Sequence, residues 1–139
     1  MPQLDAYLFF DGNCAEAMRF YERTLGGKIE MMMTHAESPM GAQASAGNAD
    51  RIMHASLALD GRQLMASDAM AGEPYQGMKN FSLSLLYPTI AEARRVFDAL
   101  SAGGRVTMPM EKTFWAEAFG MLVDRFGTSW MVSVAPKPQ

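Results

Sequence analysis

His54 is the side chain of this 139-residue sequence that is best placed to do chemistry. It lies two residues before Ser56 in a predicted strand, so both side chains face the same side of that strand. A neutral imidazole there could act as a general base or hold an anionic or phenolic ligand. The alternative is a buried histidine that is hydrogen-bonded to the backbone or to Asp68 on the neighbouring strand. The sequence leaves both open.

His35, at the end of another predicted strand, completes the histidine content of the chain. If it met His54 and a carboxylate such as Asp68 or Glu111, the three groups would form the two-histidine, one-carboxylate pattern of a metal site. Nothing in the spacing of these residues indicates that they converge. A displaced metal site is therefore only an alternative.

Aromatic and thioether side chains offer the apolar surface that a planar ligand needs. Phe114 and Trp115 lie in an irregular stretch, where large aromatic residues have less structural reason to be. The chain also holds 14 methionines, whose flexible side chains suit a cavity of irregular shape. Ordinary core packing is the alternative in both cases.

A repeated pattern predicts the elements that position these residues. An apolar strand, a helix start of the form Asn/Thr-x-x-Glu, an amphipathic helix, a Gly-Gly pair and a further strand occur twice, about 76 positions apart. Asn13 with Glu16 and Thr89 with Glu92 have the spacing of capping boxes. The repeat indicates two copies of one supersecondary unit.

Each copy is predicted to have the order β-α-β-β-β. The stretch 36–50, rich in Ala, Gly and Ser, is either a lid over a site or a disordered loop. Gly and Pro mark the connector between the copies. The predicted strands are 4–10, 28–35, 51–59, 62–68, 81–87, 105–108, 117–124 and 128–135, and the predicted helices are 14–25 and 90–102.

Composition narrows the class of protein. The net charge of −3 and the pI of 5.3 come without any basic stripe, so nucleic acid is not an expected partner. No segment approaches the roughly 20 apolar residues of a membrane span, and we expect a cytoplasmic protein. Cys14 is the only cysteine. It is either a thiol activated at a helix start or simply a small residue there.

Several segments together resemble the PhnB-like branch of the vicinal oxygen chelate superfamily, which includes glyoxalase I, extradiol dioxygenases, and bleomycin and fosfomycin resistance proteins. The resemblance implies an α+β fold of tandem βαβββ modules forming a curved mixed sheet around a cavity. It also implies a homodimer. Because halves of roughly 70 residues would bury too little surface to be stable alone, we expect a single domain, 1–139, built from modules 1–69 and 80–135 joined by 70–79. The segments are 7–17, Phe20-Tyr21, His54-Ala55, 65–70, 113–116, Phe119-Gly120, 124–127 and Trp130-Met131.

In that superfamily each module supplies two ligands to a divalent metal. The resemblance places these positions at Ala6, Ser56, Phe81 and Met131. None of the four is a carboxylate or an imidazole, which such ions prefer, so neither a metal nor another cofactor is expected. Some PhnB-like sequences carry a ubiquinone-pathway methyltransferase label. The order of elements here does not predict the doubly wound nucleotide-binding sheet that such a label suggests.

Two functions remain open. The first is a metal-free protein that binds a small molecule. The second is a lyase, isomerase or dioxygenase-type enzyme, using either a shifted metal site or His54 as the catalytic base. The predicted ligand-binding residues are His54, Ser56, Asp68, Phe81, Phe114, Trp115 and Met131.

Overall fold

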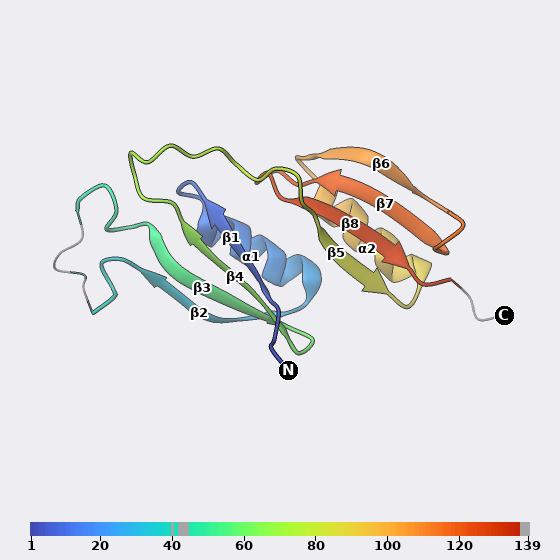
Figure 1. Ribbon diagram of the computed structural model, residues 1–139, viewed down its shortest axis with the longest axis horizontal. Helices are drawn as coiled ribbons and strands as arrows, with labels where there is room; N and C mark the ends of the chain where they lie inside the picture. Colours follow the sequence, from blue (N-terminus) through green and yellow to red (C-terminus); the bar gives the residue numbers. More distant parts are fainter. Residues whose placement is uncertain (40, 42–44, 137–139) are drawn as a thin grey trace. The chain divides into compact units, whose positions relative to one another are not determined.

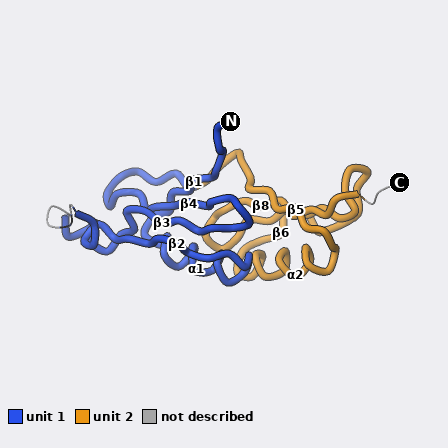
Figure 2. The backbone as a smooth tube through the Cα atoms, turned by 90° about the horizontal axis from the view of Figure 1, so that it is seen from below, with its two compact units in different colours: residues 1–77 blue, residues 78–139 orange. Residues whose placement is uncertain are grey.

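The computed structural model describes residues 1–39, 41 and 45–136. The chain forms two compact units, Met1–Gly77 and Met78–Gln139 (Figure 2). The first unit contains β1 (Ala6–Phe10), α1 (Cys14–Leu25), β2 (Lys28–Thr34), β3 (Ile52–Leu59) and β4 (Arg62–Asp68). The second contains β5 (Leu83–Tyr87), α2 (Ile90–Ser101), β6 (Arg105–Glu111), β7 (Ala118–Val123) and β8 (Ser129–Val134) (Figure 1).

The two units have the same sheet topology. The first sheet has the strand order β1-β4-β3-β2 and the second has β5-β8-β7-β6. In each, the first and last strands of the unit pair in parallel and the other pairs are antiparallel. This confirms the predicted α+β fold of two βαβββ units. Each sheet is open, with an edge strand on either side.

One helix covers one face of each sheet. On β1, Leu8 and Phe10 are buried beneath α1, whereas Tyr7 and Phe9 are exposed on the other side. Strand alternation has the same effect in the second unit, where Trp130 is buried towards α2 and Met131 faces the opposite side. We call the side without the helix the open face of each sheet.

Gly120 shows how closely α2 approaches its sheet. A Cβ atom at this position would lie 2.7 Å from the Phe97 ring on α2 and 2.7 Å from the Met110 side chain on β6. Real Cβ atoms are not found so close to other heavy atoms, so only glycine allows the helix and strand to pack at this distance. The residue type at 120 is thus set by packing.

The two helices begin in different ways. At α2 the Thr89 hydroxyl accepts a hydrogen bond from the Glu92 backbone N–H at 3.2 Å, as its capping pattern predicts. At α1 the prediction was wrong, because the Asn13 side chain makes no capping bond. Asp68 at the end of β4 takes its place, since an ionised carboxylate is a stronger acceptor than an amide and also complements the helix dipole.

Three predicted strand boundaries need correction by two residues or more, the first because β1 begins at Ala6 rather than at Leu4. Strand β6 continues past Pro109 to Glu111. Proline is tolerated because β6 is an edge strand, paired only with β7, and its register shifts between Met108 and Glu111. Strand β5 begins at Leu83, so Phe81 precedes it.

The stretch 36–50, predicted as a lid or a disordered loop, lies partly outside the described residues. On its described sides, the His35 N–H donates to the Arg51 carbonyl and the Ala36 N–H to the Ala49 carbonyl, both at 3.0 Å. None of the helices in the described part of the chain is long and apolar enough to span a membrane.

Candidate ligand-binding site

His54 lies on the open face of the first sheet and bonds to a tyrosine. The Tyr7 hydroxyl and His54 Nδ1 are 3.1 Å apart, and the two rings stack with centroids 5.6 Å apart. When the hydroxyl donates, Nδ1 is the acceptor and the ring proton lies on Nε2, the nitrogen left for a ligand. Among the described residues, the hydrogen-bond partner of His54 is Tyr7, and not Asp68 or the backbone as the alternative had it.

Asp68 has a structural task in the first unit. Its side chain is buried, and its Oδ1 atom accepts hydrogen bonds from the Gly12 N–H at 2.8 Å and the Cys14 N–H at 3.0 Å. Its Oδ2 atom accepts from the Ile52 N–H at 2.8 Å. Both oxygens thus join the start of α1 to the start of β3, which sequence reasoning, assigning Asp68 to a ligand, did not foresee.

Cys14 is not an activated thiol. Burial, together with the negative charge of Asp68, raises the pKa of this thiol from its ordinary value of 9.0 to about 12. Its side chain is fully buried at the start of α1. The alternative of a small residue at a helix start fits this environment.

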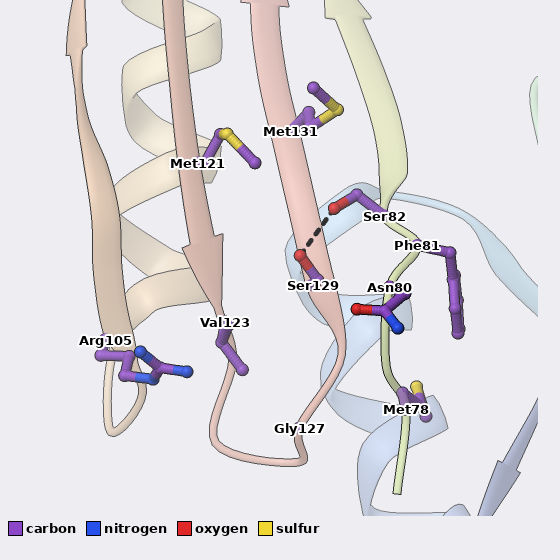
Figure 3. Close-up of a pocket in the computed structure, with 10 residues that line it drawn as sticks. All are labelled: Met78, Asn80, Phe81, Ser82, Arg105, Met121, Val123, Gly127, Ser129 and Met131. Atoms are coloured by element: carbon purple, nitrogen blue, oxygen red, sulfur yellow. Dashed lines mark hydrogen bonds between the residues drawn. The ribbon is translucent and has the colours of Figure 1, made fainter.

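The second unit contains a pocket of about 490 Å³, within the size range of ligand sites. Two predicted ligand residues, Phe81 and Met131, line it, and the other eight lining residues were not predicted. Asn80 carries a signal in its backbone, a positive φ of 63°, but no sequence pattern marks the others. The lining consists of Met78, Asn80, Phe81, Ser82, Arg105, Met121, Val123, Gly127, Ser129 and Met131 (Figure 3).

The pocket has an apolar end and an end of mixed polarity that holds its charged group. Met121 and Met131 are cross-strand neighbours on β7 and β8 and lie together toward one end. Arg105 and Asn80 lie toward the other end, where Val123 and Met78 also lie (Figure 3). Between these two ends, the hydroxyls of Ser82 and Ser129 form a hydrogen bond with an O···O distance of 2.6 Å. The two ends could hold different parts of one ligand.

Phe114 and Trp115 form a separate aromatic cluster with Phe119. The Phe114 and Trp115 rings meet edge to face at 4.8 Å, and Trp115 meets Phe119 in the same manner at 5.4 Å. Phe114 is 95% exposed. Neither Phe114 nor Trp115 is among the lining residues of the pocket. The predicted site residues are thus distributed over three places: the first sheet, the pocket and this cluster.

Strand register corrects the expected metal positions. Ala6 shares the helix-covered side of β1 with Leu8, so Tyr7 is the first-strand position on the open face. In the first sheet Tyr7 pairs with Met65 on β4.

The corresponding pair in the second sheet joins β5 to β8. Ser84 pairs there with Met131, so the counterpart of Met131 is Met65 rather than Ser56. Likewise the counterpart of Tyr7 is Ser84 rather than Phe81.

The corrected positions also do not fit a divalent metal. A phenol, an aliphatic hydroxyl and two thioethers occupy Tyr7, Ser84, Met65 and Met131, and none is a preferred ligand of a hard or borderline ion. Within the residues that the structure describes, no three His, Cys, Asp or Glu side chains lie where they could hold a metal ion. His35 and His54 do not form such a group there.

The fold belongs to a known structural class. The glyoxylase/bleomycin resistance protein/dioxygenase domain from Frankia sp. EAN1pec has the same fold, with a TM-score of 0.68, 12% identity and 98% of both chains covered. A family model described as 3-demethylubiquinone-9 3-methyltransferase matches residues 2–133. The chain belongs to this family, the PhnB-like branch of the glyoxalase/bleomycin resistance superfamily.

Individual relatives are similar over almost their whole length. Protein YjdN of Escherichia coli (strain K12) is 39% identical over 144 residues, which cover 96% of this chain and 95% of that protein. Protein PA1353 from Pseudomonas aeruginosa is 45% identical, with a TM-score of 0.90 and coverage of 99% and 100%. A putative 3-demethylubiquinone-9 3-methyltransferase, PhnB protein, from Bacillus cereus is 26% identical, with a TM-score of 0.81 and coverage of 96% and 100%.

Proposed function

We propose that this protein binds a small organic molecule of mixed polarity and that it does so without the divalent metal of its superfamily. The observation that carries the proposal is the pocket of about 490 Å³ in the second unit, with Met121 and Met131 toward one end and Arg105 and Asn80 toward the other. Ligand sites are commonly apolar with a few polar groups that fix orientation. The side chains at the corrected metal positions support the metal-free part.

Binding can be tested by filling the pocket. Met131→Trp places a large ring where the thioether lies, and we expect it to abolish binding of any ligand that occupies this space. Met31→Trp is the matched control, because Met31 lies on the open face of the other sheet, opposite Ser56 on β3. Calorimetric titration with a panel of amphiphilic acids and amides measures both. Equal affinity in the two variants, or no binding by the folded wild type, would contradict the proposal.

The metal-free part has a separate test. Elemental analysis of protein purified without chelators should give less than about 0.1 Mn, Fe or Zn per chain, because the residues at Tyr7, Met65, Ser84 and Met131 bind such ions poorly. Ligand affinity should be the same with and without added EDTA. Stoichiometric metal, or affinity lost with EDTA, would overturn it.

The contact between Tyr7 and His54 favours a second candidate, an enzyme that uses His54 as a general base. His54→Gln keeps a hydrogen-bonding side chain but cannot exchange a proton in the same way. Mass spectrometry of panel compounds incubated with the protein should then show turnover that the variant lacks. If the compounds are unchanged after incubation with the wild type, with or without added Mn²⁺, the enzyme candidate is contradicted and small-molecule binding is the function that stands.

Methyl transfer is not part of the proposal. In the part of the chain that the structure describes, neither unit has the doubly wound parallel sheet that binds nucleotide-like cofactors, since each sheet there has one parallel pair and two antiparallel pairs. We further propose a cytoplasmic homodimer, which sedimentation velocity tests through the mass of the particle. A monomer at micromolar concentration would contradict the dimer.

A further inference from the structure

We infer that the ligand of this pocket is an amphiphilic anion, with its charged group at Arg105 and its apolar part against Met121 and Met131. The inference rests on the proposed function, because it names the chemical class that the same pocket takes. The shared chemistry is a delocalised oxyanion, either a carboxylate or a phosphonate, on an aliphatic or aromatic body.

Charge is the first argument. Arg105 is the only ionised side chain among the ten described residues that line the pocket, and none of these ten is an Asp or a Glu. The ion pair found within the described residues joins Arg51 to Asp11 and does not involve Arg105. The chain as a whole carries a net charge of −3. A single guanidinium in the pocket of an acidic protein therefore favours an anion specifically at this place.

The place of Arg105 in the sheet sets where its guanidinium group lies. It is the first residue of β6 and pairs with Val123, a further lining residue on β7. Gly104 precedes it, and a Cβ there would lie 2.2 Å from the Val123 carbonyl oxygen, so the two strands approach closely at this point. The side chain extends from β6 toward Val123 on β7 (Figure 3). Its planar fork of N–H donors matches two oxygens of one anion.

The neutral polar groups also supply donors. Each serine hydroxyl has one hydrogen, and the contact between Ser82 and Ser129 uses one of the two, which leaves the other for a ligand. Asn80 adds an amide, held by a backbone with a positive φ of 63°. An anion offers only acceptors, so it can satisfy all these donors at once. A neutral amide would place its own N–H groups against some of them.

The apolar end excludes a small inorganic anion as the best ligand. Met121 and Met131 pair across β7 and β8, and both line the pocket. Thioethers adapt to the outline of an apolar group. A phosphate ion alone would leave this end filled with water, so burial of an alkyl or aryl group should add to the affinity.

The test is calorimetric titration with four probes: octanoate, octylphosphonate, octanamide and inorganic phosphate, the first three below their micelle concentrations. The wild type should bind at least one of the two acids about 10-fold or more tightly than octanamide, as expected for a hydrogen bond to a charged group. Inorganic phosphate should bind more weakly than that acid. The tighter of the two acids identifies the headgroup.

Three variants separate the role of Arg105 from a general effect of charge. Arg105→Gln should weaken the acids by about 10-fold and leave octanamide unchanged. Arg105→Lys should give an intermediate affinity, because it keeps the charge and loses the fork. Arg94→Gln, on α2 and outside the lining residues, should match the wild type. Circular dichroism of each variant establishes that it is folded.

The outcomes distinguish this inference from the function on which it rests. If octanamide binds as tightly as both acids, or if Arg105→Gln keeps full affinity for them, the anion inference is wrong while small-molecule binding stands. If none of the four probes binds the folded wild type, both fail. If Arg94→Gln weakens the acids as much as Arg105→Gln does, the effect is one of overall charge and the inference is overturned.

Discussion

Replacing Asp68 by alanine should strongly destabilise the protein. Its carboxylate accepts hydrogen bonds from the backbone N–H groups of Gly12, Cys14 and Ile52 at 2.8 to 3.0 Å. A hydrogen bond to a charged group contributes about 1.5–3 kcal/mol, and the three are not additive because they share one acceptor group. We expect Asp68→Ala to lower the free energy of unfolding by about 3–5 kcal/mol, a large part of the ~5–15 kcal/mol of a typical domain.

Asp68→Asn refines the expectation. The amide oxygen can keep the two bonds made by Oδ1, but the NH₂ group then faces the Ile52 N–H, so one bond and the charge are lost. The loss should be about 1.5–3 kcal/mol. Asp11→Asn is the matched control, because Asp11 is half exposed and makes a surface ion pair with Arg51, worth about 0–1 kcal/mol.

Urea unfolding followed by circular dichroism measures all three variants, with the slope against urea compared to show that the same surface unfolds. A loss of less than about 1 kcal/mol in Asp68→Ala would refute the structural role. The same variants address the predicted role of Asp68 in ligand binding. Folded Asp68→Asn should bind the ligand with the same affinity as the wild type. A weaker affinity would show that Asp68 takes part in ligand binding, as the sequence predicted.

Four further outcomes are expected. Cys14 should resist iodoacetamide at pH 8 in native protein and react in urea, as mass spectrometry of the adduct would show, because its thiol has a pKa of about 12 when folded. In the unfolded chain the Cys14 thiol ionises above its ordinary pKa of 9.0, whereas in the folded protein it stays neutral up to a pKa of about 12. The contribution of Cys14 to the free energy of unfolding is therefore complete below pH 9. It then falls by about 1.4 kcal/mol per pH unit until the folded pKa, a slope that Cys14→Ala should remove from unfolding curves measured between pH 9 and 11. Gly120→Ala should cost about 1–3 kcal/mol in thermal unfolding, because its Cβ meets the Phe97 ring, and Phe97→Leu in the same chain should recover part of it. We propose that the chain unfolds as one domain, because halves of roughly 70 residues bury too little surface to be stable alone; two transitions in calorimetry would count against this.

The fold was predictable because its signals are local. Helix α1 has the predicted bounds 14–25, set by an apolar stripe and by Gly26, which ends the helix in the left-handed conformation. The true cap of α1 could not be predicted in the same way. Asp68 follows it by more than 50 residues, and only the parallel pairing of β1 with β4 brings the carboxylate to the helix start.

The site was less predictable because strand pairing, rather than local sequence, brings its residues together. Met131 and Phe81 were found through the family resemblance, whereas Arg105, Asn80 and the two serines come from separate segments that strand pairing brings together. Exposed polar residues have no periodicity that marks them as a group. The contact of Tyr7 with His54 was missed for this reason too, since it spans three strands of the sheet.

The two sheets show what duplication keeps and what it changes. One row of paired residues crosses each open face in the same register: Tyr7, Met65, Ser56 and Met31 in the first, and Ser84, Met131, Met121 and Met108 in the second. The backbone positions correspond, so differences between the rows reflect side chains alone.

Each row therefore has its own chemistry. In the first, Tyr7 has a ring large enough to reach His54. In the second, Ser84 is small and thioethers occupy the next three positions, of which the first two, Met131 and Met121, line the pocket. Exchanging Tyr7 and Ser84 in a double variant should remove the partner of His54 and add a ring beside Met131. A ligand that depends only on the second unit should lose affinity from Ser84→Tyr and be indifferent to Tyr7→Ser.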